Sequence, residues 1–250
     1  MTPNNTEGME GTEGAGGRGT DPTPSPVPPS PLSPPSPRLI TEDMLEPEDP
    51  RVEFERGMSY APAATLALIG LYIAVFAWEV ASGALQSRES IIAAGALNGP
   101  DVAEGEVWRL VTATFMHGGV DHIIGNSVMM YVVGVGLEHA LGVRQMLWVY
   151  SAAGLGGSVL SAALNTGPSV GASGAIFGVM TGLVAVLHRH RDRIVVRERR
   201  IALVLGLWAA WQLLNGFFTP YIDNWAHLGG AVAGFAVAWR LEPLRLERTA

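Results

Sequence analysis

The sequence predicts an all-α polytopic membrane protein with six transmembrane helices and a disordered N-terminal tail. Three observations lead to this fold class. Hydrophobic residues occupy 48% of the 250 positions and charged residues only 16%, a composition too apolar for an ordinary soluble domain. Apolar segments long enough to cross a bilayer recur along the chain. Arginine gathers on one side of these segments, as is typical of membrane topology.

Six apolar segments follow residue 60. They span residues 61–83, 120–137, 146–164, 171–187, 201–218 and 225–239, and the last can extend to residue 244. A hydrocarbon core of about 30 Å needs about 20 helical residues. Because a backbone in lipid must satisfy its hydrogen bonds within the segment, we expect helices rather than strands.

Arginine alone sets the expected orientation, since the chain has no lysine. Six arginines lie in the loop 188–200, which we therefore expect to be cytoplasmic. Both termini then lie in the cytoplasm with twelve of the arginines after residue 50, and only Arg88 and Arg109 lie outside. A loop that directs topology is favoured over a nucleic-acid or lipid-headgroup patch, so we expect no nucleic-acid partner.

The N-terminal segment differs from the rest in composition. Residues 1–60 carry eleven of the 23 acidic residues, twelve of the 17 prolines and four arginines, which accounts for the net charge of −7. Such a segment buries too little apolar surface to fold. We expect a disordered, Pro-rich cytoplasmic tail at 1–58 and a membrane domain at 59–245, with no cleavable signal peptide. An entropic tether is favoured over a Pro-rich ligand for a partner.

A candidate nucleophile, Ser173, opens the fourth segment among small residues. A serine hydroxyl needs a base within hydrogen-bond reach and donors where an oxyanion forms. His227 opens the sixth segment, and the predicted topology places both residues at the outer side. Small residues recur every fourth position in both segments, which lets two backbones approach closely. These positions are Gly174, Gly178 and Gly182 in one, and Ala226, Gly230, Gly234 and Ala238 in the other.

Two further polar residues, His122 and Asn126, are four apart in the second segment and share one helix face. His117 precedes that helix. Polar residues inside a membrane helix are costly and often mark a site that faces a polar cavity. A satisfied hydrogen bond between helices is the structural alternative.

Other hydrolytic chemistries fit the sequence less well. Cysteine is absent, which excludes cysteine nucleophiles and cysteine-bound metals. The motif His-Glu-x-x-His is missing, because no glutamate lies between His117 and His122. Asp121 and Asp223 lie at segment edges, which disfavours an aspartyl pair. Serine chemistry remains, and it needs neither a metal nor another cofactor.

From about residue 106 to 234, these residues resemble the rhomboid family of intramembrane serine proteases. The motifs that carry the resemblance are Trp108-Arg109, His117-x4-His122-x3-Asn126, Gly171-x-Ser173-Gly174 and Ala226-His227-x2-Gly230-x3-Gly234. They occur in the family's order, each on the matching segment. The resemblance implies a six-helix rhomboid-like bundle.

The resemblance also implies residue roles. Ser173 and His227 match the catalytic dyad, which lacks an aspartate partner, and His122 and Asn126 match the oxyanion-hole side chains. Phe177 matches an aromatic residue that stacks on the histidine in some members. The supporting residues are Trp108, Arg109, His117, Gly171, Gly174, Gly178, Gly230 and Gly234, and Glu138 corresponds to a glutamate that is often structural.

The predicted function is an intramembrane serine endopeptidase that cleaves single-pass transmembrane proteins near the outer membrane face. The alternatives are a non-catalytic rhomboid-like protein that binds membrane clients, and a six-helix transporter, which would favour inverted repeats and intramembrane charges. Abundant arginine, alanine and glycine without lysine indicate a prokaryotic source. Together with the six apolar segments, this predicts a multi-pass protein of a prokaryotic cell membrane.

Overall fold

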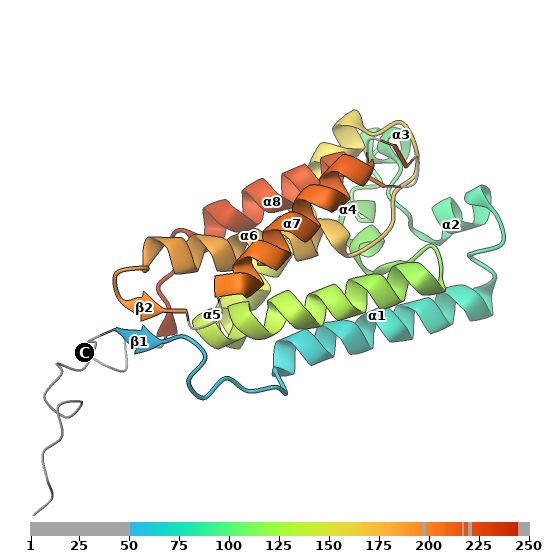
Figure 1. Cartoon of the computed structure of the whole chain (residues 1–250). Coiled ribbons are helices and arrows are strands. Elements are labelled where there is room, and N and C mark those ends of the chain that lie inside the picture. Colours follow the sequence, from blue (N-terminus) through green and yellow to red (C-terminus); the bar gives the residue numbers. More distant parts are fainter. Residues whose placement is uncertain (1–50, 197–198, 217, 220–221, 245–250) are drawn as a thin grey trace, which may run out of the picture. The chain divides into compact units, whose positions relative to one another are not determined.

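The computed structural model describes residues 51–196, 199–216, 218–219 and 222–244. All of them belong to one compact unit, Asp49–Ala250. The other unit, Met1–Glu48, lies outside the described residues, and so does most of the expected tail. The described part of the chain is mostly helical, in agreement with the predicted fold class (Figure 1).

The elements follow a simple order. The long helices among the described residues are α1 (Ala63–Ser82), α5 (Val120–Leu164), α6 (Ser173–Arg189), α7 (Arg199–Gly216) and α8 (Asn224–Ala238). The short ones between α1 and α5 are α2 (Arg88–Ala94), α3 (Gly99–Ala103), α4 (Arg109–Thr112) and the 3-10 helix η2 (Ala113–Phe115). Two short strands, β1 (Val52–Glu53) and β2 (Ile194–Val195), complete the set.

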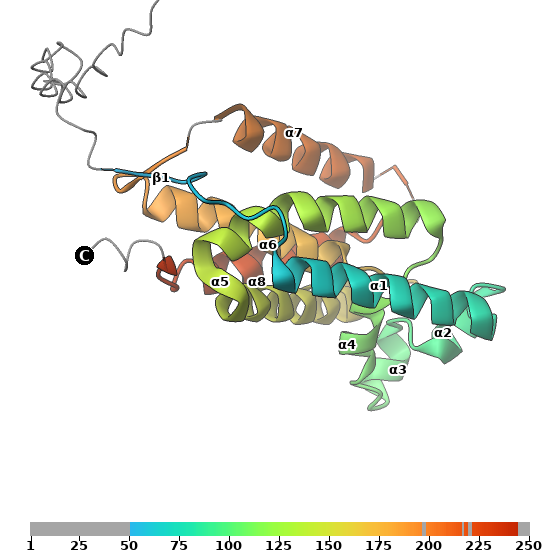
Figure 2. The same cartoon turned by 90° about the horizontal axis from the view of Figure 1, so that it is seen from below.

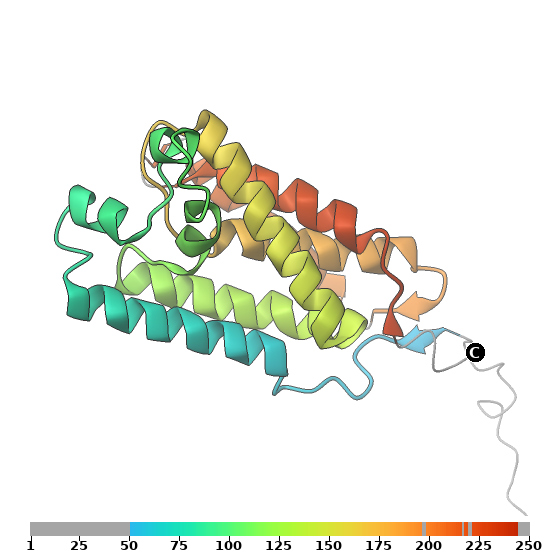
Figure 3. The same ribbon diagram turned by 180° about the vertical axis from the view of Figure 1, so that it is seen from behind.

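The expected second and third apolar segments follow each other without a loop in α5. Gly142 alone leaves the helical conformation, with φ of 76° and ψ of 169°. A positive φ is accessible to glycine at little cost, so the helix can turn sharply at this residue. Figure 3 shows the two limbs of α5 running in different directions on either side of the bend.

The packed core lies among α5, α6 and α8. Its fully buried side chains include Met130, Leu137 and Met146 of α5 and Ile176 and Val179 of α6. Helix α7 lies at the edge of the bundle (Figure 2). In this arrangement the beginnings of α6 and α8 lie beside each other, and the candidate site is found there.

Two helices of the described residues, α1 and α5, are long and apolar enough to cross a membrane. Helix α6 is apolar but shorter. Large apolar side chains such as Ile73, Trp78 and Val132 are exposed on α1 and α5, as lipid contact requires. Six crossings remain a prediction.

The strand β1 pairs in parallel with β2, so Val52 lies beside Ile194. The backbone carbonyl of Phe54 lies 2.7 Å from Nε2 of His139, and the Phe54 ring is 8% exposed. The predicted disordered tail, 1–58, includes these residues, of which Val52 and Glu53 pair with β2 and Phe54 contacts His139. Composition alone does not separate the apolar Val52 and Phe54 from the long polar stretch that they follow.

Glu138 fixes the beginning of α1. Its carboxylate accepts hydrogen bonds from the N–H groups of Ala64 and Thr65, at 3.0 and 2.9 Å, and from the Thr65 hydroxyl at 2.8 Å. The first N–H groups of a helix lack partners within the helix, and an acidic group there is favourable. Glu138 therefore ties α5 to α1.

Candidate active site

Ser173, the first residue of α6, lies beside the first turn of α8. Its Oγ is 2.9 Å from Nε2 of His227, a hydrogen-bond distance, although 54 positions separate the two residues. Ser173 is partly exposed, whereas His227 is only 3% exposed. A neutral imidazole at this distance can accept the hydroxyl proton, so the pair has the geometry of an activated nucleophile.

Glycine permits the close approach of α6 and α8. A Cβ on Gly230 would overlap the carbonyl oxygen of Gly174, and a Cβ on Gly234 would overlap the backbone of Gly178. Seen from α6, a Cβ on Gly178 would lie 2.6 Å from the carbonyl oxygen of Gly230. The two faces of small residues therefore meet backbone to backbone, and this contact sets the distance between the reactive side chains.

The N-terminus of α8 is held by Asp223. Its Oδ1 accepts a hydrogen bond of 3.0 Å from the N–H of Ala226, and its Oδ2 accepts one from the Ser161 hydroxyl. Asn165 donates to the same Oδ2 from 3.2 Å. A cap of this kind satisfies free N–H groups of the first turn. These bonds join α8 to the end of α5 and orient the turn that carries His227.

Phe177 supports the imidazole of His227 from one face. The two rings are stacked with centroids 4.3 Å apart and planes 12° apart. Nδ1 of His227 is buried and has no hydrogen-bond partner in the described part of the chain. Among these residues, the orientation of the ring therefore comes from packing and from Ser173 rather than from a third polar group.

The turn before Ser173 brings two side chains of α5 to the same place. Gly171 has a φ of 131°, and a Cβ on it would lie 2.7 Å from Nε2 of His122 and 3.5 Å from Nδ2 of Asn126. Nδ2 of Asn126 is buried without an acceptor among the described residues. The N–H of Ser173 begins α6 and has no acceptor within that helix. The side-chain nitrogens of His122 and Asn126 therefore lie beside the turn that leads to Ser173.

His117 lies in the loop between η2 and α5 and is fully buried. Its ring packs between Tyr72 and His122, with centroid distances of 5.3 and 5.2 Å. Burial, assisted by the nearby His122, lowers the pKa of His117 to about 4. The side chain is therefore neutral at pH 7 and serves as a packing group in this loop.

Arg109 organises the segment between α1 and α5. Its guanidinium stacks over Trp108 at 4.5 Å and pairs with Glu106 at 2.6 Å and Asp101 at 3.4 Å. It also donates a hydrogen bond of 2.9 Å to the carbonyl of Ala96. The side chain is 7% exposed, so these partners offset the cost of burying its charge.

A cavity of about 1180 Å³ lies beside the candidate pair. Ser173, His227, His122 and Asn126 line it, together with Trp208 and Gln212 of α7 and residues 165–171 of the loop before α6. Pockets for small molecules are about 300–1,000 Å³. The cavity is therefore larger than a typical small-molecule pocket.

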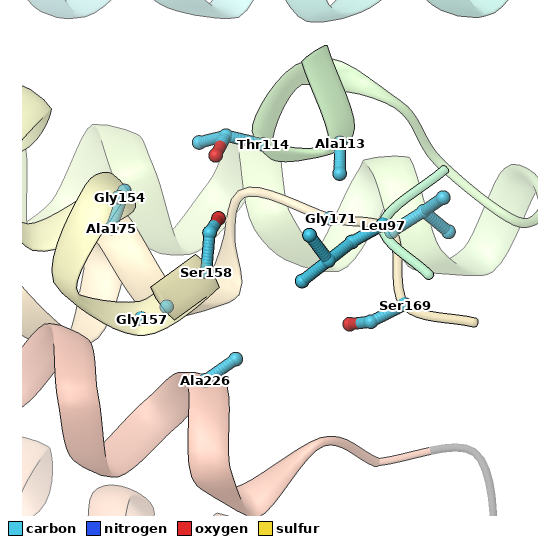
Figure 4. A pocket seen from close by; sticks show the side chains of 12 residues that line it. Leu97, Ala113, Thr114, Gly154, Gly157, Ser158, Ser169, Gly171, Ala175 and Ala226 are labelled. Atoms are coloured by element: carbon cyan, nitrogen blue, oxygen red, sulfur yellow. The ribbon is translucent and has the colours of Figure 1, made fainter. Parts of the chain in front are cut away.

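A second cavity, of about 20 Å³, is lined by Gly171 and Gly174 among others. The hydroxyl groups of Ser158 and Thr114 face each other across it (Figure 4). This volume is about what one water molecule needs.

Within the described residues, no group of three or more His, Asp or Glu side chains could hold a metal ion. That the site works without a cofactor remains a prediction.

Reasoning from sequence alone missed two acidic residues of this region. Glu79 is a single carboxylate inside the apolar α1, and such residues are rarely without a role. Asp223 directly precedes α8, where an acidic N-cap is favoured. Both signals were present in the sequence, but neither residue belongs to the motifs that drew attention.

The fold and the site define a class of protein: a helical, membrane-type bundle in which a serine and a histidine meet at the ends of two glycine-packed helices. The model of the rhomboid domain matches residues 104–243. The chain belongs to the rhomboid family. Members of this family are integral membrane proteins, and they include intramembrane serine proteases.

Several relatives show the extent of the similarity. The chain is 34% identical over 177 residues to the rhomboid protease GluP of Bacillus subtilis (strain 168). The aligned residues cover 71% of this chain and 34% of that protein. It is 30% identical over 213 residues to the rhomboid protease AarA of Providencia stuartii, and the alignment covers 74% of this chain and 75% of that protein. RHOMBOID-like protein 1 of Arabidopsis thaliana is 37% identical over 139 residues, 55% of this chain and 35% of that protein. The chain thus spans only about a third of the length of GluP and of the Arabidopsis protein.

Proposed function

We propose that this protein is an intramembrane serine endopeptidase that cleaves single-pass transmembrane proteins near the outer face of the bilayer. The observation that carries the proposal is the distance of 2.9 Å between Ser173 Oγ and His227 Nε2. The stacked ring of Phe177 and membership of the rhomboid family support it, as does Nδ2 of Asn126, which has no acceptor in the part of the chain that the structure describes.

The reaction begins with proton transfer from Ser173 Oγ to Nε2 of His227 as Oγ attacks the carbonyl carbon of the scissile peptide. The developing oxyanion accepts hydrogen bonds from His122, Asn126 and the N–H of Ser173. The imidazolium of His227 then protonates the leaving amine, which gives an acyl-enzyme. Water attacks the ester with His227 as base, and Ser173 regains its proton when the acid product leaves.

The proposal includes the predicted topology. The chain crosses the membrane six times, with both termini and the loop 188–200 in the cytoplasm and Ser173 near the outer face. A prokaryotic cell membrane is the proposed location, on the strength of the lysine-free composition. Relatives occur in both bacteria and Arabidopsis thaliana.

The alternative is a non-catalytic rhomboid-like protein that binds membrane clients, and one experiment separates the two. The full chain and its Ser173→Ala variant are placed in liposomes with a single-pass substrate that has small residues at the cut. A protease cleaves the substrate, and Ser173→Ala binds it without cleavage. Binding without cleavage by both proteins would support the alternative.

A further inference from the structure

Glu79 is a buried acid for which the proposed reaction has no use. It lies near the end of α1 and is fully buried in an otherwise apolar helix. Both of its carboxylate oxygens face the backbone nitrogen of His117, at 3.2 and 3.1 Å, so one N–H donates to the pair of oxygens. Burying a carboxylate is costly unless its hydrogen bonds compensate. The contact therefore holds the loop before α5 firmly against α1.

The next backbone N–H in that loop reaches a residue of the candidate site. Gly118 donates a hydrogen bond to Nδ1 of His122 at 3.4 Å. In a neutral imidazole one ring nitrogen accepts while the other carries the proton. When Nδ1 accepts from Gly118, the proton resides on Nε2, the atom that lies beside Gly171. The backbone of the loop thus decides which nitrogen of His122 can donate toward the site.

The ring of His117 reinforces this connection. It lies edge-on to the ring of His122 and also contacts Tyr72 of α1, while its Nδ1 is 3.2 Å from the carbonyl oxygen of Phe115. A shift of the His117 backbone would therefore move both the ring that packs on His122 and the N–H of Gly118.

From these contacts we propose that Glu79 is a positioning residue for the oxyanion side of the site. It fixes the backbone of His117 and Gly118, and that backbone sets the ring orientation and the Nε2–H tautomer of His122. The inference rests on the proposed function, in which His122 donates to the oxyanion. Glu79 itself touches neither substrate nor reacting atoms.

Glu138 provides a matched comparison. It is also a buried carboxylate that accepts backbone N–H groups, but its partners are at the beginning of α1. Both acids tie α1 to the bundle, whereas only Glu79 contacts the loop that leads to His122. If Glu79 only held α1 to the bundle, its replacement and that of Glu138 would have similar effects on stability and on cleavage rate.

The test is a double-mutant cycle on the full chain in liposomes, with cleavage of a single-pass substrate as the readout. Loss of one oxyanion donor commonly lowers kcat by about 10²–10³-fold. We expect Glu79→Leu to lower kcat at least tenfold with little change in KM, and Glu79→Gln to retain more activity, since its carbonyl still accepts one N–H. Combined with His122→Ala, either substitution should cause little further loss. Glu138→Gln should lower the melting temperature, and any fold-loss of rate that it causes should multiply with the fold-loss of His122→Ala.

The tautomer gives a second readout that does not depend on cleavage. In the NMR spectrum of protein labelled with ¹⁵N-histidine, the signals that are missing from His122→Ala identify His122. In the parent, these signals should show a protonated Nε2, and in Glu79→Gln they should show a mixture of the two tautomers. An unchanged tautomer in Glu79→Gln, or losses for Glu79 and His122 that multiply, would overturn the inference. Failure of the proposed function looks different, because neither the parent nor Ser173→Ala would then cleave the substrate, whereas the ¹⁵N signals would still report the tautomer of His122.

Discussion

The ring of Phe177 lies parallel to the imidazole of His227, with centroids 4.3 Å apart. Phe177 is one turn after Ser173 on α6, so a single helix supplies both the hydroxyl that contacts the imidazole and the surface on which the imidazole rests. Since Nδ1 of His227 has no partner among the described residues, this stacking and the contact with Ser173 orient the ring.

Replacement of Phe177 by leucine tests this relationship. Aromatic stacking contributes about 0.5–1.5 kcal/mol beyond buried area, which corresponds to about a two- to tenfold lower rate if the ring must keep its orientation during reaction. Cleavage by Phe177→Leu is the measurement. Phe235→Leu is the control, because Phe235 stacks on Trp239 near the other end of α8. Equal rates for the parent and Phe177→Leu would show that the stack is irrelevant to the reaction.

The glycine contacts predict that even alanine is too large at Gly230. Its Cβ would overlap the carbonyl oxygen of Gly174, so the two helices must separate. Overpacking commonly costs about 1–3 kcal/mol, and separation also lengthens the distance between Ser173 and His227. We expect a lower melting temperature and at least a tenfold lower cleavage rate.

The control for this prediction is Gly70→Ala in α1. A Cβ at Gly70 has nothing within 4 Å, and alanine is about 1 kcal/mol better than glycine inside a helix. This variant should keep its activity and lose no stability. Parental stability and rate in Gly230→Ala would contradict the packing argument.

The cap of α8 makes a separate prediction. Asp223→Ala removes the acceptor for Ala226, Ser161 and Asn165, and loss of an N-cap costs about 0.5–2 kcal/mol. Cleavage should slow because the turn that carries His227 loses its tie to α5. Asp223→Asn keeps a carbonyl acceptor and should fall between the parent and Asp223→Ala. If Asp223→Ala were indistinguishable from the parent, the cap would play no part in positioning.

Much of this arrangement could be predicted from sequence, because its signals are local. Spacings of four in α6 and α8 predict faces that can meet closely, and the arginine pattern predicts a common side for Ser173 and His227. The helix limits agree to within a few residues, as for the segment 61–83 and α1 (Ala63–Ser82). The mostly helical fold and the rhomboid family are both confirmed.

The remainder depends on contacts between distant residues. No local pattern connects Glu79 to the backbone of His117, or Ser161 to Asp223, because each pair forms only after the helices have packed. The pairing of β1 with β2 likewise joins segments more than 130 residues apart, and a two-residue strand leaves almost no periodic signal. These contacts had to be seen in the structure.

The predicted topology can be tested with single cysteines, since the chain has none of its own. A cysteine at Val196, in the arginine-rich loop, should react with a membrane-impermeant reagent only after the membrane is opened. A cysteine at Glu104, in the loop between α3 and α4, should react in intact cells. Reaction of the Val196 cysteine in intact cells would reverse the orientation and place Ser173 near the cytoplasmic face.

The central claim is that His227 activates Ser173, and a fluorophosphonate probe measures this directly. The probe reacts with a serine oxygen only when a base withdraws its proton, so labelling depends on the pair and on no particular substrate. We expect labelling of the parent at Ser173, identified by mass spectrometry of the modified peptide, and none in Ser173→Ala or His227→Ala. As a control for folding, the melting temperatures of all three proteins should agree within a few degrees. Equal labelling of the parent and His227→Ala would contradict the account, because the hydrogen bond between Ser173 and His227 would then carry no chemistry.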